Sequence, residues 1–186
     1  MPEKIWKRTA QEDERVKKQV KSLLIVGAGS FATEVEEMAR MLGYTDIVFI
    51  DDCISPPRCE PVVGSIANIQ NFRKDYREAI VAFGNNEFRK RCTEELIRCG
   101  YSVPTLVHPT AYVSPEAQLA LGCIIRAKAV ISRNVKMGFS CIANVGALVD
   151  HDCVIGDYSH ILMGAVVRNK VSVPSLSWIN SNQVIE

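Results

Sequence analysis

From Val113 onward, apolar side chains recur at every sixth position. The series comprises Val113, Leu119, Ile125, Ile131, Met137, Ala143, Val149, Ile155, Ile161, Val167, Val173 and Ile179. From Ala117 to Ser177, a small or β-branched residue follows four positions after each member of the series. A period of six fits neither a helix nor a flat alternating strand. It predicts a parallel β-helix, in which three hexapeptides form one triangular coil and stacked coils bury a common core.

The chain before this repeat follows a different pattern. An apolar run at 23–26 is followed by a glycine turn, by apolar positions with helical spacing and by a second apolar run at 47–50. This order predicts a parallel βαβ unit. A third strand at 79–83 and a helix that ends at Gly100 complete a small Rossmann-like α/β domain.

We therefore expect an α/β domain followed by an all-β domain. The predicted segments are a charged N-terminal arm over 1–21, the α/β domain over 22–104, a junction over 105–112 and the β-helix over 113–186. The arm reads as a solvated helix or frayed end, with a partner-binding helix as the alternative.

Composition narrows the class of protein. The 22 basic and 21 acidic side chains leave a formal net charge of +1, which favours neither nucleic acid nor an anionic membrane as a partner. The seven cysteines include no C-x-x-C pair, which favours a reducing compartment over a disulfide framework or a zinc site. No apolar run reaches the roughly 18 residues of a membrane span. We expect a cytoplasmic protein without membrane insertion.

Two loops of the α/β domain suggest a nucleotide site. The stretch "GAGSFA" at 27–32 matches a turn that presents backbone amides to phosphate, and Asp51 ends the second strand where it would meet a ribose. The loop "GNNEFRKR" ends the third strand at the same sheet edge. A plain βα turn and a helix N-cap are the alternatives. The domain is short for a dinucleotide, so a mononucleotide or nucleotide-sugar fits better.

The histidines of the repeat occupy outward positions. His151 lies two residues after inward Val149, so it and Asp152 are expected at a corner of the coil, where a neutral imidazole can accept a proton. The alternative is a surface histidine without a catalytic role, and the spacing predicts no metal site. His160 directly precedes an inward residue, so it is expected on the outer face of a strand. Its role there is either structural packing or contact with a ligand.

The motifs together resemble a known family. The stretches "FGNNEFRKR", "HPTAYVSPEA" and "NVGALVDHDCVIGDYSHI", with the hexapeptide register, resemble the sugar O- and N-acetyltransferases of sialic acid and bacillosamine biosynthesis, over about 22–182. The resemblance implies a homotrimer of left-handed β-helices, with acetyl-CoA as co-substrate between subunits. It also implies a nucleotide-linked acceptor, in the bacillosamine members a UDP-linked 4-amino sugar. Compared with the family, the β-helix is short at its C-terminus.

Site residues follow from the resemblance by motif. His151 is expected as general base and Asp152 as the residue that raises its basicity. His160 and Asn169 are expected at the coenzyme, with a backbone amide at position 169 facing the oxyanion. Contacts to the nucleotide-sugar are expected from Gly29, Ser30, Phe31, Asp51, Asp52, Gly84 and Glu87.

Two other functions stay open at this point. One is a non-catalytic nucleotide-sugar-binding or scaffold relative of these enzymes. The other is an NAD-dependent oxidoreductase, which rests only on the glycine turn and Asp51. The sequence leaves open the acceptor sugar and whether nitrogen or oxygen is acetylated.

Overall fold

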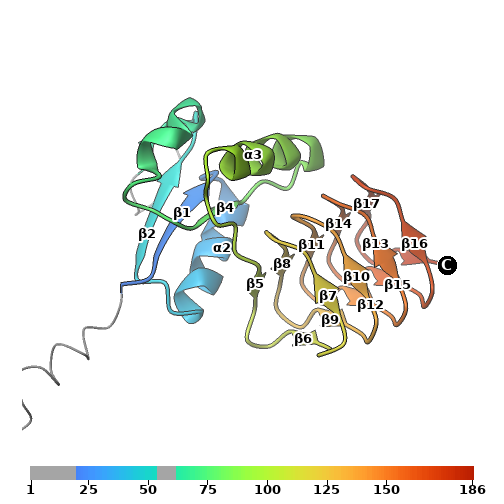
Figure 1. The fold of residues 1–186 in the computed structure, drawn as a ribbon. Coiled ribbons are helices and arrows are strands. Elements are labelled where there is room, and N and C mark those ends of the chain that lie inside the picture. Colours follow the sequence, from blue (N-terminus) through green and yellow to red (C-terminus); the bar gives the residue numbers. More distant parts are fainter. Residues whose placement is uncertain (1–19, 54–61) are drawn as a thin grey trace, which may run out of the picture.

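The computed structural model describes residues 20–53 and 62–186, so nearly all of the predicted N-terminal arm lies outside the described residues. An α/β domain lies against one end of a column of stacked coils (Figure 1). Among the described residues, no helix is long and apolar enough to cross a membrane. The predicted order, an α/β domain followed by a parallel β-helix, is confirmed.

The α/β domain is built on one parallel sheet. Its elements are β1 (Ser22–Val26), α2 (Ser30–Met41), β2 (Asp46–Ile50), β3 (Val62–Gly64), a 3-10 helix η1 (Ile66–Phe72), β4 (Ala79–Val81) and α3 (Asn86–Arg98). The strand order is β3-β2-β1-β4. Since β1 pairs in parallel with both β2 and β4, the carboxyl ends of these strands and the loops that follow them share one edge.

The two faces of this sheet pack against different layers. Leu23 and Ile25 share a cluster with α2 and with Ile142 of the β-helix. Leu24 and Val26, which alternate with them, pack on the side of α3. A parallel strand buried on both faces needs a continuous apolar run, and β1 has one. The α/β domain is therefore joined to the coils by a shared apolar core.

The coils consist of two-residue strands separated by turns. They are β5 (Leu106–Val107), β6 (Tyr112–Val113), β7 (Gln118–Leu119), β8 (Ile124–Ile125), β9 (Val130–Ile131), β10 (Lys136–Met137), β11 (Ile142–Ala143), β12 (Leu148–Val149), β13 (Val154–Ile155), β14 (His160–Ile161), β15 (Val166–Val167), β16 (Ser172–Val173), β17 (Trp178–Ile179) and β18 (Val184–Ile185). The strand β5 lies inside the segment predicted as a junction, so the first coil begins one hexapeptide before Val113.

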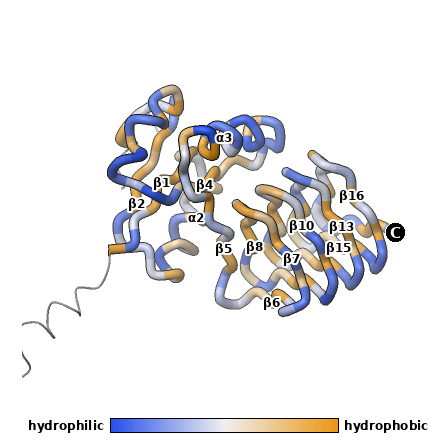
Figure 2. Tube along the Cα trace, in the orientation of Figure 1, coloured by the Kyte–Doolittle hydropathy of each residue, from blue (hydrophilic) through white to orange (hydrophobic). Residues whose placement is uncertain are grey.

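Three parallel sheets run along the column. The first sheet has the order β17-β14-β11-β8-β5, the second β18-β15-β12-β9-β6 and the third β16-β13-β10-β7. Each strand pairs with the strand one coil away, as Ile142 does with Ile124 and His160. Hydrophobic segments recur along every coil (Figure 2).

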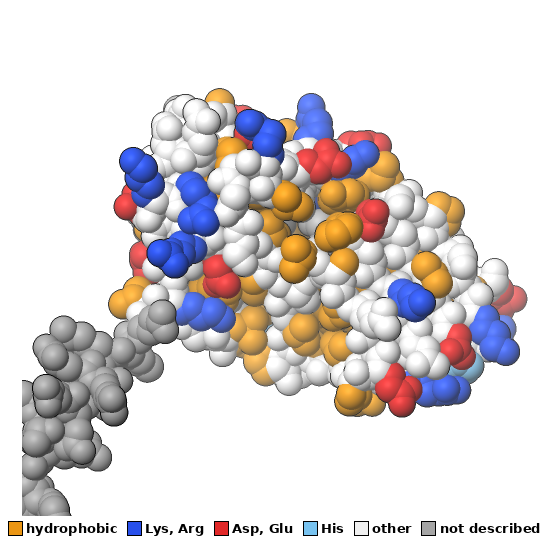
Figure 3. All heavy atoms as spheres, in the orientation of Figure 1, with side chains coloured by type: hydrophobic (Ala, Val, Ile, Leu, Met, Phe, Trp, Pro, Cys, Tyr) orange, Lys and Arg blue, Asp and Glu red, His pale blue; other side chains and the backbone are white. Residues whose placement is uncertain are grey.

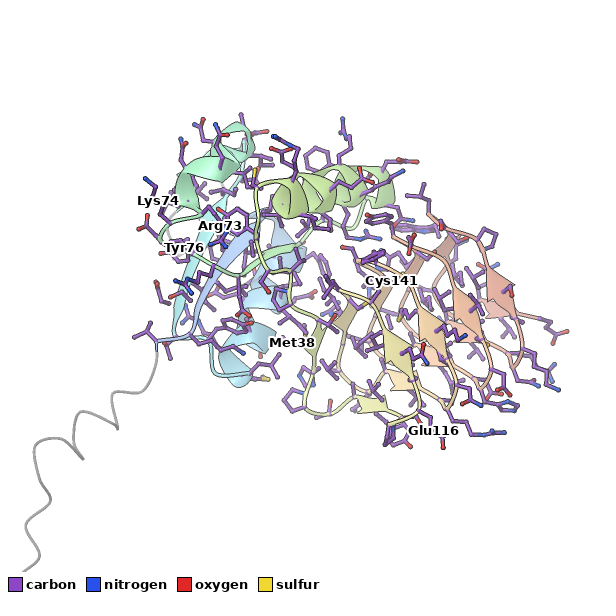
Figure 4. All side chains as sticks on the ribbon, viewed as in Figure 1. Met38, Arg73, Lys74, Tyr76, Glu116 and Cys141 are labelled. Carbon is purple, nitrogen blue, oxygen red and sulfur yellow. The ribbon has the colours of Figure 1, made fainter. Side chains whose placement is uncertain are left out.

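The inward positions of the predicted register form one buried core. Cys123, Cys141 and Cys153 are among its small members and are buried, with Cys141 seen among the coils in Figure 4. At the corners, every sixth residue from Gly122 to Asn182 has a left-handed backbone, with φ between 48° and 76°. Eight of these corner residues are not glycine. The repeat thus fixes both the core and the direction of each corner side chain.

Candidate active site

His151 lies at a corner between β12 and β13, as predicted. Its Nδ1 is 2.7 Å from Oδ2 of Asp152, whose backbone is left-handed with a φ of 63°. The other carboxylate oxygen of Asp152 accepts a hydrogen bond of 2.9 Å from the Asn134 amide, one coil away. The His151 and Asp152 side chains are 32% and 34% exposed. Asn134, Asp152 and His151 therefore form a chain of contacts that ends at a solvent-accessible ring.

The electrostatics of this corner favour one tautomer of the ring. The hydrogen bond with His151, and after it the one from Asn134, lowers the pKa of the Asp152 carboxyl, so Asp152 is ionised near neutral pH. An ionised carboxylate can only accept, so Nδ1 of His151 carries the proton. Within the described part of the chain, the His151 ring forms its one side-chain hydrogen bond through Nδ1, and Nε2 forms none. This nitrogen is therefore available to accept a proton.

Asn169 lies at the same corner, one coil beyond His151. The neighbouring Lys170 amide donates a 3.0 Å hydrogen bond to the His151 carbonyl, which fixes the spacing of the two coils here. Asn169 is exposed, and no described residue accepts a hydrogen bond from its backbone amide. The corner therefore presents a proton acceptor and a backbone N–H donor side by side.

His160 has different surroundings. It points outward from β14, as predicted, but the α/β domain covers it and leaves it 4% exposed. Its Nδ1 is 3.3 Å from the Gly84 carbonyl oxygen and its Nε2 is 3.4 Å from the Asn144 amide nitrogen. Its ring stands edge-on to Trp178, with 4.8 Å between centroids.

Burial sets the charge of His160. Burial, and after it the charge of Arg89, lowers the pKa of His160 to about 4, despite the opposing hydrogen bond with Gly84. The ring is therefore neutral near pH 7, and it donates its Nδ1 proton to the Gly84 carbonyl because a carbonyl can only accept. His160 links the first sheet of the β-helix to the loop after β4.

Close packing and hydrogen bonds within the α/β domain hold the predicted glycine turn in place. Gly27 has a φ of 110°, and a Cβ there would lie 3.1 Å from the Ala82 carbonyl oxygen. The Ala28 amide donates a 2.6 Å hydrogen bond to Asp51, and the Asp52 side chain accepts one of 2.9 Å from Ile66. Both acidic residues border a pocket of about 300 Å³ at the edge of the sheet. The turn and the acidic pair therefore lie together at the predicted edge.

The N-terminus of α2 contains Ser30 and Phe31, with Gly29 as the N-cap. The Phe31 ring lies 6.5 Å from that of His160, between centroids. Arg126 of the β-helix faces the Phe31 ring at 5.6 Å. The turn predicted to hold a nucleotide-sugar thus lies close to His160. The sequence pattern gave no indication that His160 has a neighbour in the α/β domain.

The residues from the loop after β4 into the first turn of α3 have two kinds of surroundings, some exposed and some buried against the coils. Asn85 caps α3 by accepting a 2.9 Å hydrogen bond from the Phe88 amide, and Glu87 is exposed. A Cβ on Gly84 would lie 3.9 Å from Cε1 of His160. Asn86, by contrast, is buried against the coils. The N-cap interpretation is confirmed for Asn85, and Gly84 lies beside His160.

Within one chain, the predicted residues form two groups. The corner with His151 and Asn169 lies between the second and third sheets. His160, the glycine turn and Gly84 lie over the first sheet, which is the opposite side of a triangular coil. An open groove of about 490 Å³ crosses the third sheet along Lys136 and Val154 and extends towards the corner at Asp157, on the far side of that sheet from His151.

Sequence comparison identifies similar proteins. Residues 22–96 match the family model of the PglD N-terminal domain. The chain is 29% identical over 171 residues to a GDP-perosamine N-acetyltransferase of Escherichia coli O157:H7, covering 87% of this chain and 76% of the relative.

Two solved structures share the whole architecture. The acetyltransferase domain of PglB from Neisseria gonorrhoeae is 33% identical with a TM-score of 0.79, covering 89% of this chain and 91% of that one. PerB from Caulobacter crescentus, solved with CoA and GDP-perosamine, is 26% identical with a TM-score of 0.79, covering 89% and 88%. The chain belongs to the left-handed β-helix acetyltransferases with a hexapeptide repeat. Within that class, it is a member of the sugar O- and N-acetyltransferase family to which these proteins belong.

Proposed function

We propose that this protein transfers the acetyl group of acetyl-CoA to an amino group of a nucleotide-linked sugar, with His151 as the general base. The arrangement at the corner carries the proposal: an ionised Asp152 orients the ring and leaves its Nε2 free to accept a proton. The relatives support the substrate classes, since one is named a GDP-perosamine N-acetyltransferase and another was solved with CoA.

The reaction assigns a role to each group at the corner. The amine nitrogen of the sugar attacks the thioester carbonyl carbon, and Nε2 of His151 takes the proton that the nitrogen loses. Charge develops on the carbonyl oxygen, where the Asn169 amide serves as donor. The carbon–sulfur bond then breaks, the amide product forms, and the thiolate of CoA takes the proton back from His151.

The two groups of site residues must meet for this reaction, and in one chain they lie on opposite sides of the coil. We propose that a homotrimer brings His151 of one subunit to the nucleotide-sugar loops of its neighbour. Large apolar side chains exposed on the coils, such as Leu121 and Phe139, support an assembly of this kind. Hydrophobic side chains also gather around the junction of the two domains (Figure 3).

Thiol release from acetyl-CoA tests the function. The purified protein is assayed with UDP-linked and GDP-linked amino sugars and with the corresponding sugars that carry a hydroxyl instead. Release that depends on the amino group supports N-acetylation, and the nucleotide that gives the higher kcat/KM identifies the acceptor class. Tight binding of a nucleotide-sugar without thiol release from any acceptor would favour the non-catalytic alternative.

A further inference from the structure

Arg89, in the first turn of α3, has no exposed surface. Its guanidinium group has five N–H donors, and all of them are used. Nε donates to the Ser140 carbonyl at 2.8 Å, and Nη1 donates to the Phe83 and Gly84 carbonyls at 3.0 Å each. Nη2 donates to the Asn86 side chain at 2.8 Å and to the Tyr158 carbonyl at 2.6 Å. The group is buried and fully hydrogen-bonded.

The acceptors of Arg89 come from both domains. Phe83 and Gly84 belong to the loop after β4, and Asn86 begins α3. Ser140 and Tyr158 are left-handed corner residues on successive coils of the β-helix. One planar group therefore joins the loop of the α/β domain to two coils at once.

The buried charge of Arg89 makes the junction between the two domains sensitive to small movements. No carboxylate among the described residues pairs with it. Burial lowers the pKa of Arg89 to about 10, which leaves the group charged near neutral pH. A buried charge that loses its hydrogen bonds strongly destabilises the fold, because neither water nor protein then solvates it. Any shift of the loop relative to the coils would break some of these bonds, so the charge opposes movement between the domains.

The same contacts hold Gly84, a residue of the predicted acceptor site, against His160 of the β-helix. The Gly84 carbonyl that Arg89 binds also accepts the proton of His160. Asn86, which accepts from Arg89, donates to the carbonyls of Leu176 and Ser177 at 2.9 and 3.0 Å, directly before Trp178. The positions of Gly84, His160 and Trp178 relative to each other therefore depend on one buried network.

We infer that Arg89 is a positioning residue, which fixes the nucleotide-sugar loop of the α/β domain against the coils and thereby sets the affinity for the acceptor. The inference rests on the proposed function for what the loop binds, and on the hydrogen bonds alone for how it is held. Arg89 is fully buried, so it contacts neither the substrate nor the base. Its removal is expected to raise the KM for the acceptor and to spare the acetyl-transfer step.

The test compares R89K with R91K. Lysine keeps the charge but lacks the planar fork, so it cannot reach acceptors on both domains. Arg91 lies on the same helix but is exposed, beside the Phe88 ring, which makes R91K a matched control. For R89K we expect the acceptor KM to rise by about 10-fold or more, with kcat and the acetyl-CoA KM within about threefold of wild type. R91K should match wild type.

A second variant tests the inference if R89K does not fold. N86A removes one acceptor of Arg89 and both bonds to the coil of Trp178 without stranding the whole charge, and we expect a smaller rise in acceptor KM, about threefold to fivefold. An unchanged acceptor KM in folded R89K overturns the inference. A lower melting temperature with equal changes in both KM values also overturns it, because that result indicates a purely structural role.

Hydrogen exchange separates this inference from the proposed function. In R89K the amides of the loop after β4 should exchange about 10-fold faster than in R91K, while those of the distal coils keep their rates. This measurement needs no substrate. If wild-type protein releases no thiol, the proposed function fails, and the exchange rates still decide whether Arg89 holds the loop. Equal exchange in R89K and R91K contradicts the positioning role.

Discussion

The corner around His151 and the interface around His160 use the same repeat and give opposite environments. Both histidines occupy outward positions of the coil, yet the His151 side chain is 32% exposed and the His160 residue is 4% exposed. A carboxylate contacts the first ring, and a carbonyl and an amide contact the second. The β-helix sets the direction of a side chain, whereas the cover of the α/β domain sets its chemistry.

The largest effect that distinguishes the two histidines is expected from removing the base at the corner. H151A should lower kcat by about 100- to 10,000-fold, the range for loss of a general base, with little change in nucleotide-sugar affinity. Thiol release under saturating substrates measures kcat, and calorimetry measures affinity. H108A is the matched control, since the ring of His108 forms hydrogen bonds only with Thr110 among the described residues, and it should stay within about twofold of wild type. Near-normal turnover in H151A would exclude this histidine as the base.

The covered histidine predicts a pH effect on stability. The pKa of His160 is lowered from 6.5 to about 4 in the folded protein. Between these values the unfolded chain binds more protons than the folded one, so stability falls as the pH falls from about 6.5 to 4, by at most about 3 kcal/mol. Urea unfolding of wild type and H160Q across this range measures the effect.

H160Q should show a shallower loss of stability towards acid than wild type, because its side chain does not titrate. The control W178F alters packing against the same ring but keeps His160, so it should keep the wild-type slope. The same acid slope in H160Q and wild type would show that the histidine is not the group responsible.

A moderate effect is expected from the partner of the corner base. D152N should lower kcat by about 10-fold, since asparagine cannot balance the positive charge that forms on His151. Asparagine tolerates the left-handed backbone found at this position, so the turn should persist. D150N is the control, because within the described ranges the Asp150 side chain accepts only from the His151 backbone amide, and the side-chain oxygen of asparagine can accept the same bond. An unchanged kcat in D152N would contradict the role given to the carboxylate.

The smallest effects concern the backbone of the corners. Lys128 is an exposed, left-handed corner residue, and K128G should stabilise the fold by up to about 1 kcal/mol. Gly146 occupies the equivalent position three corners on, and a Cβ there would meet nothing within 4 Å. G146A should therefore cost about 1 kcal/mol through the backbone alone. Thermal unfolding measures both, and shifts of the same sign would contradict a backbone origin.

Much of the β-helix was predictable because its core depends on a local period. Every inward position from Val113 to Ile179 follows from spacing in the sequence, and so does the placing of His151 and Asp152 at a corner. The first strand of the column, β5, escaped because the stretch around His108 reads as a linker. Side chains that repeat with the coil can be placed without knowing what lies beside them.

The interface could not be predicted, because it depends on how two domains meet. His160 lies 76 residues from Gly84, and Arg89 lies 69 residues from Tyr158, so no local pattern connects them. The charged stretch after Asn85 suggests an exposed first turn of a helix, and it gives no sign that Arg89 turns inward. An arginine four residues after an N-cap is the only signal in the sequence, and it is weak.

The regular corners also restrict how this chain can change its length. A single inserted residue would shift the register of all later coils, whereas an insertion of one whole coil would preserve it. Even a whole coil would be harmful between Ser140 and Tyr158, because it would separate the two carbonyls that Arg89 reaches together. Beyond Ile179 a further coil would disturb neither carbonyl. The column can therefore grow at its far end while its junction with the α/β domain keeps a fixed length.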